Sequence, residues 1–127
     1  MKRFAINGAG RIGRLVMREY LRRQPDNLQL VAVNDLTDTE TLAYLLEFDS
    51  VHGRLPSPVA IEGDQLCVAG VTVPVYHKAE PEHLPWSDLG VDWVLEGTGL
   101  FRKREDASKH LAAGAGKVLI SAPSESA

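Results

Sequence analysis

The residues with the clearest chemical potential are three glycines near the N-terminus and one acid further along. Gly8, Gly10 and Gly13 form a G-x-G-x-x-G pattern directly after the apolar run Phe4 to Ile6, and Asp35 lies 22 residues after Gly13. In dinucleotide-binding sites one glycine permits a tight strand-to-helix turn, the next lets the backbone approach a pyrophosphate, and the third lets the helix pack closely. The helix N-terminus then faces the phosphates, and the acid accepts hydrogen bonds from a ribose. The pattern predicts dinucleotide binding; the alternative is a tight turn that binds nothing.

The apolar runs that follow have the lengths of buried strands and alternate with segments of helical period. This alternation is typical of a doubly wound, mostly parallel sheet. We expect its strands at Phe4 to Ile6, Leu28 to Val33, Trp93 to Leu95 and Val118 to Ile120.

Three amphipathic helices are expected to pack on this sheet. The first begins near Arg11 and stops at residues 24–27, and the second covers Thr39 to Leu46 with Thr39 or Asp38 as its cap. The third spans about Arg104 to Ala113, and Gly114 ends it. The apolar stripe of the first helix is expected to consist of Ile12, Leu15, Val16 and Glu19/Tyr20.

Between the second helix and the Trp93 strand, short alternating runs are separated by turn residues. The runs are Val59 to Ile61, Leu66 to Val68 and Val71 to Val75, and the turns are Gly63-Asp64 and Ala69-Gly70. Such spacing favours antiparallel hairpins in place of a helical crossover. The predicted fold is therefore α/β, a Rossmann-like doubly wound sheet with a small antiparallel β insertion.

Length and composition exclude several classes of function. The chain has 127 residues, 44% of them hydrophobic and 24% charged, as expected for one compact domain. Its net charge of −3 and the lack of a long basic cluster argue against nucleic acid as a partner. It has no apolar stretch that could span a bilayer and no signal-peptide pattern, so we expect a cytoplasmic protein without membrane contact. The single cysteine agrees with a reducing compartment.

Six blocks of the sequence carry a family resemblance. They are I-N-G-x-G-R-I-G-R (6–14), V-N-D-L (33–36), L-L-E-F-D-S-V-H-G-R (45–54), L-P-W-S-D-L-G-V-D-W-V (84–94), E-G-T-G-L-F (96–101) and H-L-A-A-G-A-G-K-V-L-I-S-A-P (110–123). In this order they resemble phosphorylating glyceraldehyde-3-phosphate dehydrogenase. The closely similar erythrose-4-phosphate dehydrogenases are an alternative, although the N-D-L and S-A-P blocks favour the first family.

The resemblance implies a homotetrameric enzyme that oxidises glyceraldehyde 3-phosphate with NAD and phosphate, through a cysteine thiohemiacetal and a thioester. In that family the cysteine lies in an S-C-T-T-N block beyond the S-A-P strand, and this sequence stops before it. We therefore expect residues 1–127 to be an incomplete NAD-binding domain, without its final strand and the substrate domain, and inactive alone. The rival interpretation is a non-catalytic, stand-alone nucleotide-binding module.

The resemblance also implies which residues hold NAD. Asp35 is expected to select NAD over NADP, because a carboxylate accepts from two ribose hydroxyls and repels a 2′-phosphate. The chain departs from the family with Ala9 in place of phenylalanine, Gly97 in place of serine and Ala79 in place of an arginine near the adenine, for which Lys78 is a candidate substitute. The implied cofactor residues are Asn7, Gly8, Gly10, Arg11, Ile12 and Gly13 at the pyrophosphate, Asn34 and Asp35 at the adenosine, Thr98 and Gly99 at the crevice, and Ser121 near the nicotinamide.

The remaining residues that could do chemistry have plainer interpretations. Cys67 lies in an alternating strand pattern without an adjacent base, so a packing role is expected. The four histidines lack metal-ligand spacing, and no metal site is expected. Trp86 and Trp93 are expected to pack in the core.

Overall fold

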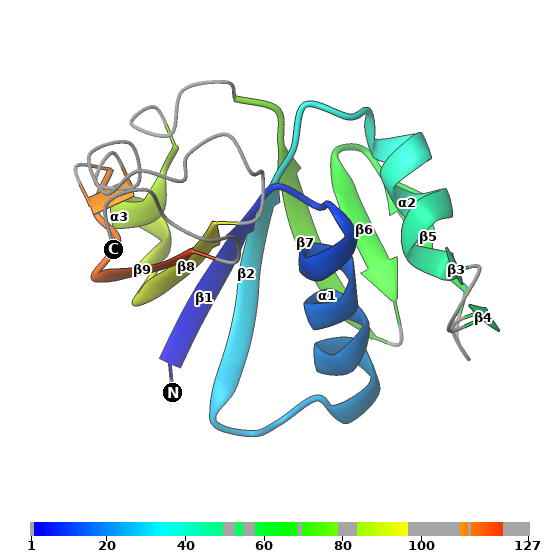
Figure 1. Cartoon of the computed structure of the whole chain (residues 1–127), viewed down its shortest axis with the longest axis horizontal. Coiled ribbons are helices and arrows are strands. Elements are labelled where there is room, and N and C mark those ends of the chain that lie inside the picture. The colour runs from blue at the N-terminus through cyan, green and yellow to red at the C-terminus, as the bar shows by residue number, and fades with distance from the viewer. Residues whose placement is uncertain are drawn as a thin grey trace.

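The computed structural model describes residues 2–49, 53–54, 58–68, 70–78, 84–96, 110–111 and 113–120. Within these residues one seven-stranded sheet has the strand order β5-β6-β7-β2-β1-β8-β9, with helix α1 lying in front of it (Figure 1). The elements are β1 Lys2–Asn7, α1 Arg11–Arg23, β2 Leu28–Asn34, α2 Thr39–Glu47, β3 Phe48–Asp49, β4 Gly53–Arg54, β5 Ala60–Glu62, β6 Gln65–Val68, β7 Val71–Tyr76, α3 Trp86–Leu89, β8 Trp93–Glu96 and β9 Lys117–Ile120.

The sheet is mixed, as the sequence predicts. Strands β7, β2, β1, β8 and β9 pair in parallel, whereas β5, β6 and β7 form an antiparallel meander at one edge. All four predicted parallel strands and all three hairpin strands are confirmed, with ends within two residues of those expected. The sequence analysis missed two short features, the antiparallel β3–β4 pair and the four-residue helix α3.

The helix ends follow from local chemistry. Asp38 is the N-cap of α2 and accepts the backbone N–H of Thr41 at 2.8 Å, which confirms one of the two predicted caps. Helix α1 ends at Gln24, whose left-handed φ of 41° breaks the helix where the turn was expected. Of the third predicted helix, only His110 and Leu111 are described as helical; residues 104–109 lie outside the described residues. No helix of the described residues is long and apolar enough to cross a membrane.

Two apolar clusters lie on opposite faces of the sheet because side chains alternate along each strand. Phe4 and Ile6 of β1 join the cluster that α1 and α2 cover. Ala5 joins the second cluster, which contains Trp86 of α3. Trp86 is fully buried, and Trp93 is partly buried with its ring stacked on Phe4 at 4.7 Å, so both tryptophans pack as expected.

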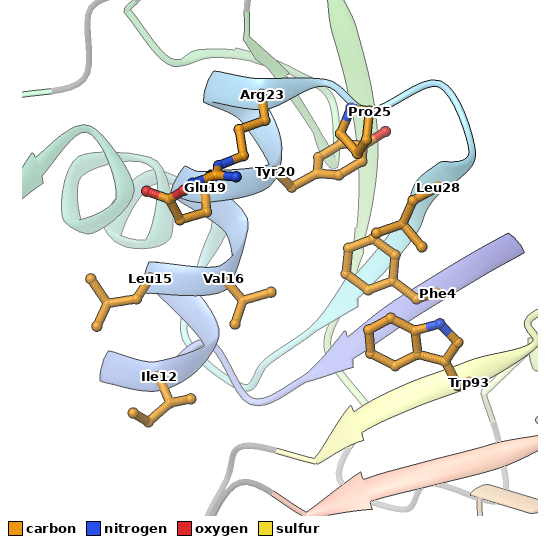
Figure 2. A pocket seen from close by; sticks show the side chains of 10 residues that line it. All are labelled: Phe4, Ile12, Leu15, Val16, Glu19, Tyr20, Arg23, Pro25, Leu28 and Trp93. Carbon is orange, nitrogen blue, oxygen red and sulfur yellow. Dashed lines mark hydrogen bonds and ion pairs between the residues drawn. The ribbon is translucent and has the colours of Figure 1, made fainter.

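The apolar stripe predicted for α1 is confirmed in part, because Val16 and Tyr20 pack against the core cluster, but it omitted the most buried residues of the helix. The buried face carries Met17 and Leu21, whereas Ile12 is 47% exposed. The predicted residues also form one wall of an apolar groove of about 380 Å³ between α1 and the sheet, with Phe4 and Trp93 on the other wall (Figure 2). The prediction left out Met17 and Leu21, and the close contact of Gly13 with β1 fixes the orientation that buries them.

Candidate dinucleotide-binding site

The glycine-rich turn between β1 and α1 has the geometry that its sequence predicts. Gly8 has φ of +94°, a conformation that glycine adopts without strain. A Cβ atom on Gly13 would collide with the backbone carbonyl oxygen of Gly8 and press on Ile6. These two glycines therefore make the sharp turn and the close approach of α1 to β1.

Three hydrogen bonds hold this turn in place. The N–H of Gly8 donates to the carbonyl oxygen of Asn34 at 2.7 Å, and the N–H of Ala9 donates to Oδ2 of Asp35 at 2.6 Å. The guanidinium of Arg14 donates to the carbonyl oxygen of Ala9 at 2.9 Å. The turn is thus tied to the end of β2 and to its own helix. Sequence reasoning did not assign this role to Arg14, although it ends the I-N-G-x-G-R-I-G-R block.

Asp35 stands at the carboxyl end of β2 with both carboxylate oxygens already oriented. Oδ1 accepts the N–H of Thr37 at 2.8 Å, and Oδ2 accepts the N–H of Ala9. A carboxylate has about four acceptor positions, so each oxygen keeps capacity for a hydroxyl group. The carboxylate is fixed before any ligand arrives and is still able to accept from a sugar diol.

The N-terminus of α1 is open toward an anion. Its N-cap is Gly10, no side chain caps it, and its first turn has no acidic residue. The first N–H groups of a helix lack intrahelical partners and carry the positive end of the helix dipole. This end of α1 directly follows the turn that Asp35 holds. The helix N-terminus, which can bind an anion, therefore lies next to the carboxylate of Asp35, which can bind a sugar diol.

A pocket of about 610 Å³ lies next to Asp35, between the start of α2 and the β5–β6 turn. Its lining is acidic at Asp38, Glu40 and Asp64, and hydrogen bonds from Thr41 hold the pKa of the Asp38 carboxyl below its usual value. His77 also lines it and donates from Nδ1 to the carbonyl oxygen of Asp35 at 2.8 Å. A pocket so lined disfavours additional negative charge at the Asp35 end of the site.

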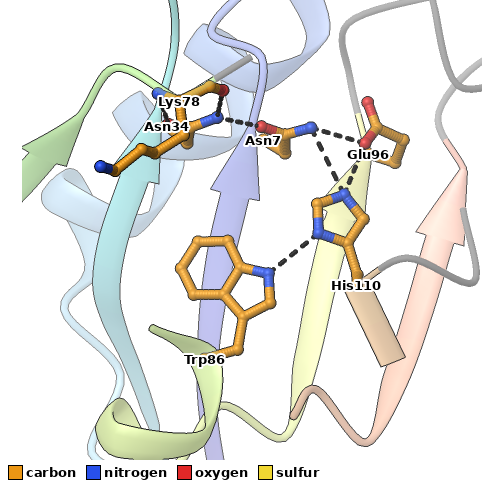
Figure 3. Close-up of polar contacts among 6 residues, drawn as sticks. All are labelled: Asn7, Asn34, Lys78, Trp86, Glu96 and His110. Carbon is orange, nitrogen blue, oxygen red and sulfur yellow. Dashed lines mark hydrogen bonds and ion pairs between the residues drawn. The ribbon is translucent and has the colours of Figure 1, made fainter. Parts of the chain in front are cut away.

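Beneath the turn, buried polar side chains form a continuous hydrogen-bonded chain across three strands (Figure 3). Sequence reasoning singled out neither Glu96 nor His110. The sequence could have indicated Glu96, because a polar residue ends each of three buried parallel strands: Asn7, Asn34 and Glu96. The members of this polar chain are Asn7, Asn34, Trp86, Glu96, His110 and the backbone of Lys78.

The structure brings together the predicted residues of the turn and the end of β2. The side chain of Asn34, however, is buried and bonded to Asn7 and Lys78, and that of Ile12 faces the apolar groove. The side chain of Lys78 is exposed, and its contact with an adenine stays a prediction. The predicted positions Thr98, Gly99 and Ser121, with the departures at Gly97 and Ala79, lie outside the described residues.

Cys67 does not pack in the core. Its neighbours Leu66 and Val68 are buried, so the thiol points to the opposite, half-exposed face of β6. There Sγ lies 3.9 Å from a carboxylate oxygen of Glu62 and 3.9 Å from the hydroxyl of Thr72. Neither neighbour is a histidine or a cation of the kind that activates a thiol nucleophile.

The fold, the glycine turn and the placement of Asp35 define a Rossmann-like dinucleotide-binding domain. The family described as glyceraldehyde 3-phosphate dehydrogenase, NAD binding domain, matches residues 2–104. The chain therefore belongs to the glyceraldehyde 3-phosphate dehydrogenase family and corresponds to its NAD-binding domain.

Curated relatives match over nearly the whole chain. Glyceraldehyde-3-phosphate dehydrogenase of Thermotoga maritima is 53% identical over 125 residues, which are 98% of this chain and 38% of that protein. The enzyme of Geobacillus stearothermophilus is 57% identical over 94% of this chain and 35% of its own length. That of Kitasatospora aureofaciens is 54% identical over 100% of this chain and 38% of its own. The chain thus spans little more than a third of these relatives.

Proposed function

We propose that the chain is the NAD-binding portion of an enzyme that oxidises glyceraldehyde 3-phosphate, with NAD and inorganic phosphate, to the acyl phosphate. The observation that carries the proposal is the 2.6 Å hydrogen bond from the N–H of Ala9 to the carboxylate of Asp35. It joins the phosphate-binding turn to the acid that would hold the ribose, at the carboxyl ends of neighbouring parallel strands. The names of the curated relatives support glyceraldehyde 3-phosphate as the substrate of the complete enzyme.

In this proposal the chain binds and orients the cofactor. The N–H groups at the start of α1 face the pyrophosphate, and Asp35 accepts the two hydroxyls of the adenosine ribose. A 2′-phosphate would meet Asp35 together with the acidic lining of the adjacent pocket, which favours NAD over NADP. NAD, when bound, supplies the acceptor for the hydride of the substrate.

The remaining cofactor residues are part of the same proposal. Gly8 and Gly13 shape the turn, while Gly10, Arg11 and Ile12 offer backbone to the pyrophosphate. Asn7 and Asn34 serve through their backbone positions, since their side chains are engaged with each other. From the family resemblance we also assign Thr98 and Gly99 to the border of the crevice and Ser121 to the nicotinamide side. Residues 1–127 belong to the NAD-binding domain, and the complete protein is a cytoplasmic homotetramer.

The chemical steps need groups other than those described here. A covalent route through a thiol requires a histidine or a cation that activates it, and the neighbours of the Cys67 thiol are the carboxylate of Glu62 and the hydroxyl of Thr72. We therefore assign to the described residues the binding of NAD and no catalytic step.

The test uses the complete protein that contains this chain. Calorimetric titration with NAD and NADP is combined with steady-state assays of NADH formation from glyceraldehyde 3-phosphate or erythrose 4-phosphate, with and without phosphate. We expect NAD binding, preference for NAD, and phosphate-dependent oxidation of glyceraldehyde 3-phosphate. Faster turnover of erythrose 4-phosphate would favour the related dehydrogenase, and NAD binding without turnover of either aldehyde would favour a non-catalytic module.

A further inference from the structure

The buried polar chain beneath the glycine turn connects the ends of β2, β1 and β8. In the strand register Asn7 lies opposite Asn34 on one side and Glu96 on the other. All three side chains continue the face that carries Ala5, Ala32 and Val94, whose cluster contains Trp86. Asn7, Asn34, Trp86, Glu96 and His110 are each at most 3% exposed.

Each hydrogen bond in this chain has a defined direction. The backbone N–H of Lys78 donates to Oδ1 of Asn34 at 2.8 Å, so the amide of Asn34 points its nitrogen at Oδ1 of Asn7, at 2.6 Å. The amide of Asn7 must then donate to Oε1 of Glu96, which it does at 2.7 Å. An obligate backbone donor thus sets the orientation of both asparagines.

A second obligate donor fixes the other end. The indole N–H of Trp86 donates to Nδ1 of His110 at 2.9 Å, so Nδ1 carries no proton in the neutral ring. The proton of the neutral ring is therefore on Nε2, which donates to Oε1 of Glu96 at 2.7 Å. In this tautomer the 3.3 Å approach of Asn7 Nδ2 to His110 Nε2 is a contact between two donors. Both series of donors converge on the carboxylate of Glu96.

The residues that the polar chain aligns directly precede the cofactor site. Gly8 follows Asn7, and its N–H is bonded to the backbone of Asn34 at 2.7 Å. Asp35 follows Asn34, and its carboxylate holds the N–H of Ala9. The alignment of the end of β1 with the end of β2 thus sets the distance between the glycine turn and Asp35.

We propose that Trp86, His110 and Glu96 are positioning residues for NAD, which act through Asn7 and Asn34 to hold the glycine turn and Asp35 in binding geometry. The inference rests on the proposed function. Apolar residues of similar volume could fill the same space at comparable stability. A hydrogen-bonded series in which every orientation is determined instead admits one alignment of the three strand ends. In the described residues every buried side-chain nitrogen and oxygen has a hydrogen-bond partner.

The first experiment removes only the donor that fixes His110. In the complete protein, Trp86→Phe leaves Nδ1 without its partner and frees the ring to place its proton on either nitrogen. We expect the Kd for NAD to rise roughly three- to tenfold. The matched control is Trp93→Phe, the same change at a tryptophan that stacks on Phe4 and takes no part in the polar chain. We expect the control to lower the Tm without changing the Kd.

A second pair of variants keeps the inference falsifiable if Trp86→Phe does not fold. Glu96→Gln retains an oxygen that accepts from Asn7 and His110, whereas Glu96→Met has similar volume and no acceptor of comparable strength. We expect Glu96→Met to weaken NAD binding roughly tenfold or more, and Glu96→Gln to restore most of the lost affinity. Equal affinities in these two variants would show that volume alone matters and would overturn the inference.

The proton on His110 is an independent readout. A neutron crystal structure of the complete protein is expected to place hydrogen on Nε2 and none on Nδ1. Hydrogen on Nδ1 would overturn the inference whatever the variants show. The failures are distinguishable: wild-type protein that does not bind NAD overturns the proposed function, whereas unchanged affinity in folded Trp86→Phe overturns only the positioning role.

Discussion

The N–H of Ala9 and the carboxylate of Asp35 are joined by a hydrogen bond of 2.6 Å across the mouth of the β1–α1 turn. One side chain therefore belongs to two parts of the proposed site, the turn that faces the pyrophosphate and the acid that faces the ribose. A change at Asp35 must affect both the charge that meets the ribose and the shape of the turn. The two effects are separable, because an amide keeps an acceptor oxygen without the charge.

Asp35→Asn is expected to keep the acceptor for the N–H of Ala9 through its amide oxygen, to lose the hydrogen bond from Thr37, and to lose the charge that excludes NADP. The ratio of the NAD and NADP affinities should fall by roughly tenfold or more, because hydrogen bonds to charged groups contribute about 1.5–3 kcal/mol. Asp35→Gly also removes the acceptor for Ala9, so it should weaken both cofactors further. Calorimetric titration of the complete protein measures these affinities. A preference for NAD that survives in both variants would show that another group selects the cofactor.

Gly13→Ala tests the close approach of α1 to β1. The added methyl group meets the carbonyl oxygen of Gly8, so the turn must shift. We expect a loss of about 1–3 kcal/mol in the free energy of unfolding and a clear loss of NAD affinity. The control is Gly70→Ala, where φ of +83° makes the change costly but no atom lies within 4 Å of the new methyl. If the control also loses NAD affinity, the loss in Gly13→Ala results from general destabilisation and not from the shifted turn.

The sequence predicted the sheet, the turn and the acid because each has a local cause. Apolar runs, a glycine spacing and an N-cap aspartate are visible without tertiary contacts, and all of them are confirmed. The inward face of α1 was predicted only in part: Val16 and Tyr20 pack on the core, but Met17 and Leu21 were left out, and the contact of Gly13 with β1 that helps to turn them inward is tertiary. The polar chain was missed because Glu96 and His110 are far from Asn7 in sequence: strand register brings Glu96 beside Asn7, and a tertiary contact brings His110 to Glu96.

The cap of α2 gives a dependence of stability on pH. Hydrogen bonds from Thr41 lower the pKa of Asp38 from its ordinary value of 3.8. A lowered pKa means that the stabilisation is complete above pH 3.8 and is lost as the pH falls through the folded-state pKa. Asp38→Ala should lower the Tm at neutral pH and flatten its decline in acid.

Asp38→Asn is the control for that change, because asparagine caps a helix about as well as aspartate but does not titrate in this range. Asp38→Asn should have the Tm of the wild type at neutral pH. Its Tm should fall less steeply in acid than that of the wild type, as expected for Asp38→Ala. The measurement is the Tm of the three proteins from pH 2 to pH 7. An unchanged acid dependence in both variants would show that the cap does not stabilise the folded state through its charge.

Cys67 is expected to be dispensable for catalysis. Its thiol lies near Glu62 and Thr72 on the outer side of β6, away from the glycine turn. In the complete protein Cys67→Ser should leave kcat and KM within about a factor of two of the wild type, the range of ordinary surface changes. Iodoacetamide should label Cys67 no faster than a free thiol. Loss of turnover in Cys67→Ser, with binding of NAD intact, would make this cysteine the nucleophile and refute its assignment.

The most direct test is a crystal structure of the complete protein with NAD bound. We predict that the pyrophosphate lies against the first N–H groups of α1 and that both oxygens of Asp35 accept from the ribose diol while Oδ2 still holds the N–H of Ala9. A pyrophosphate bound away from the start of α1, or a ribose that does not contact Asp35, would contradict the proposed site.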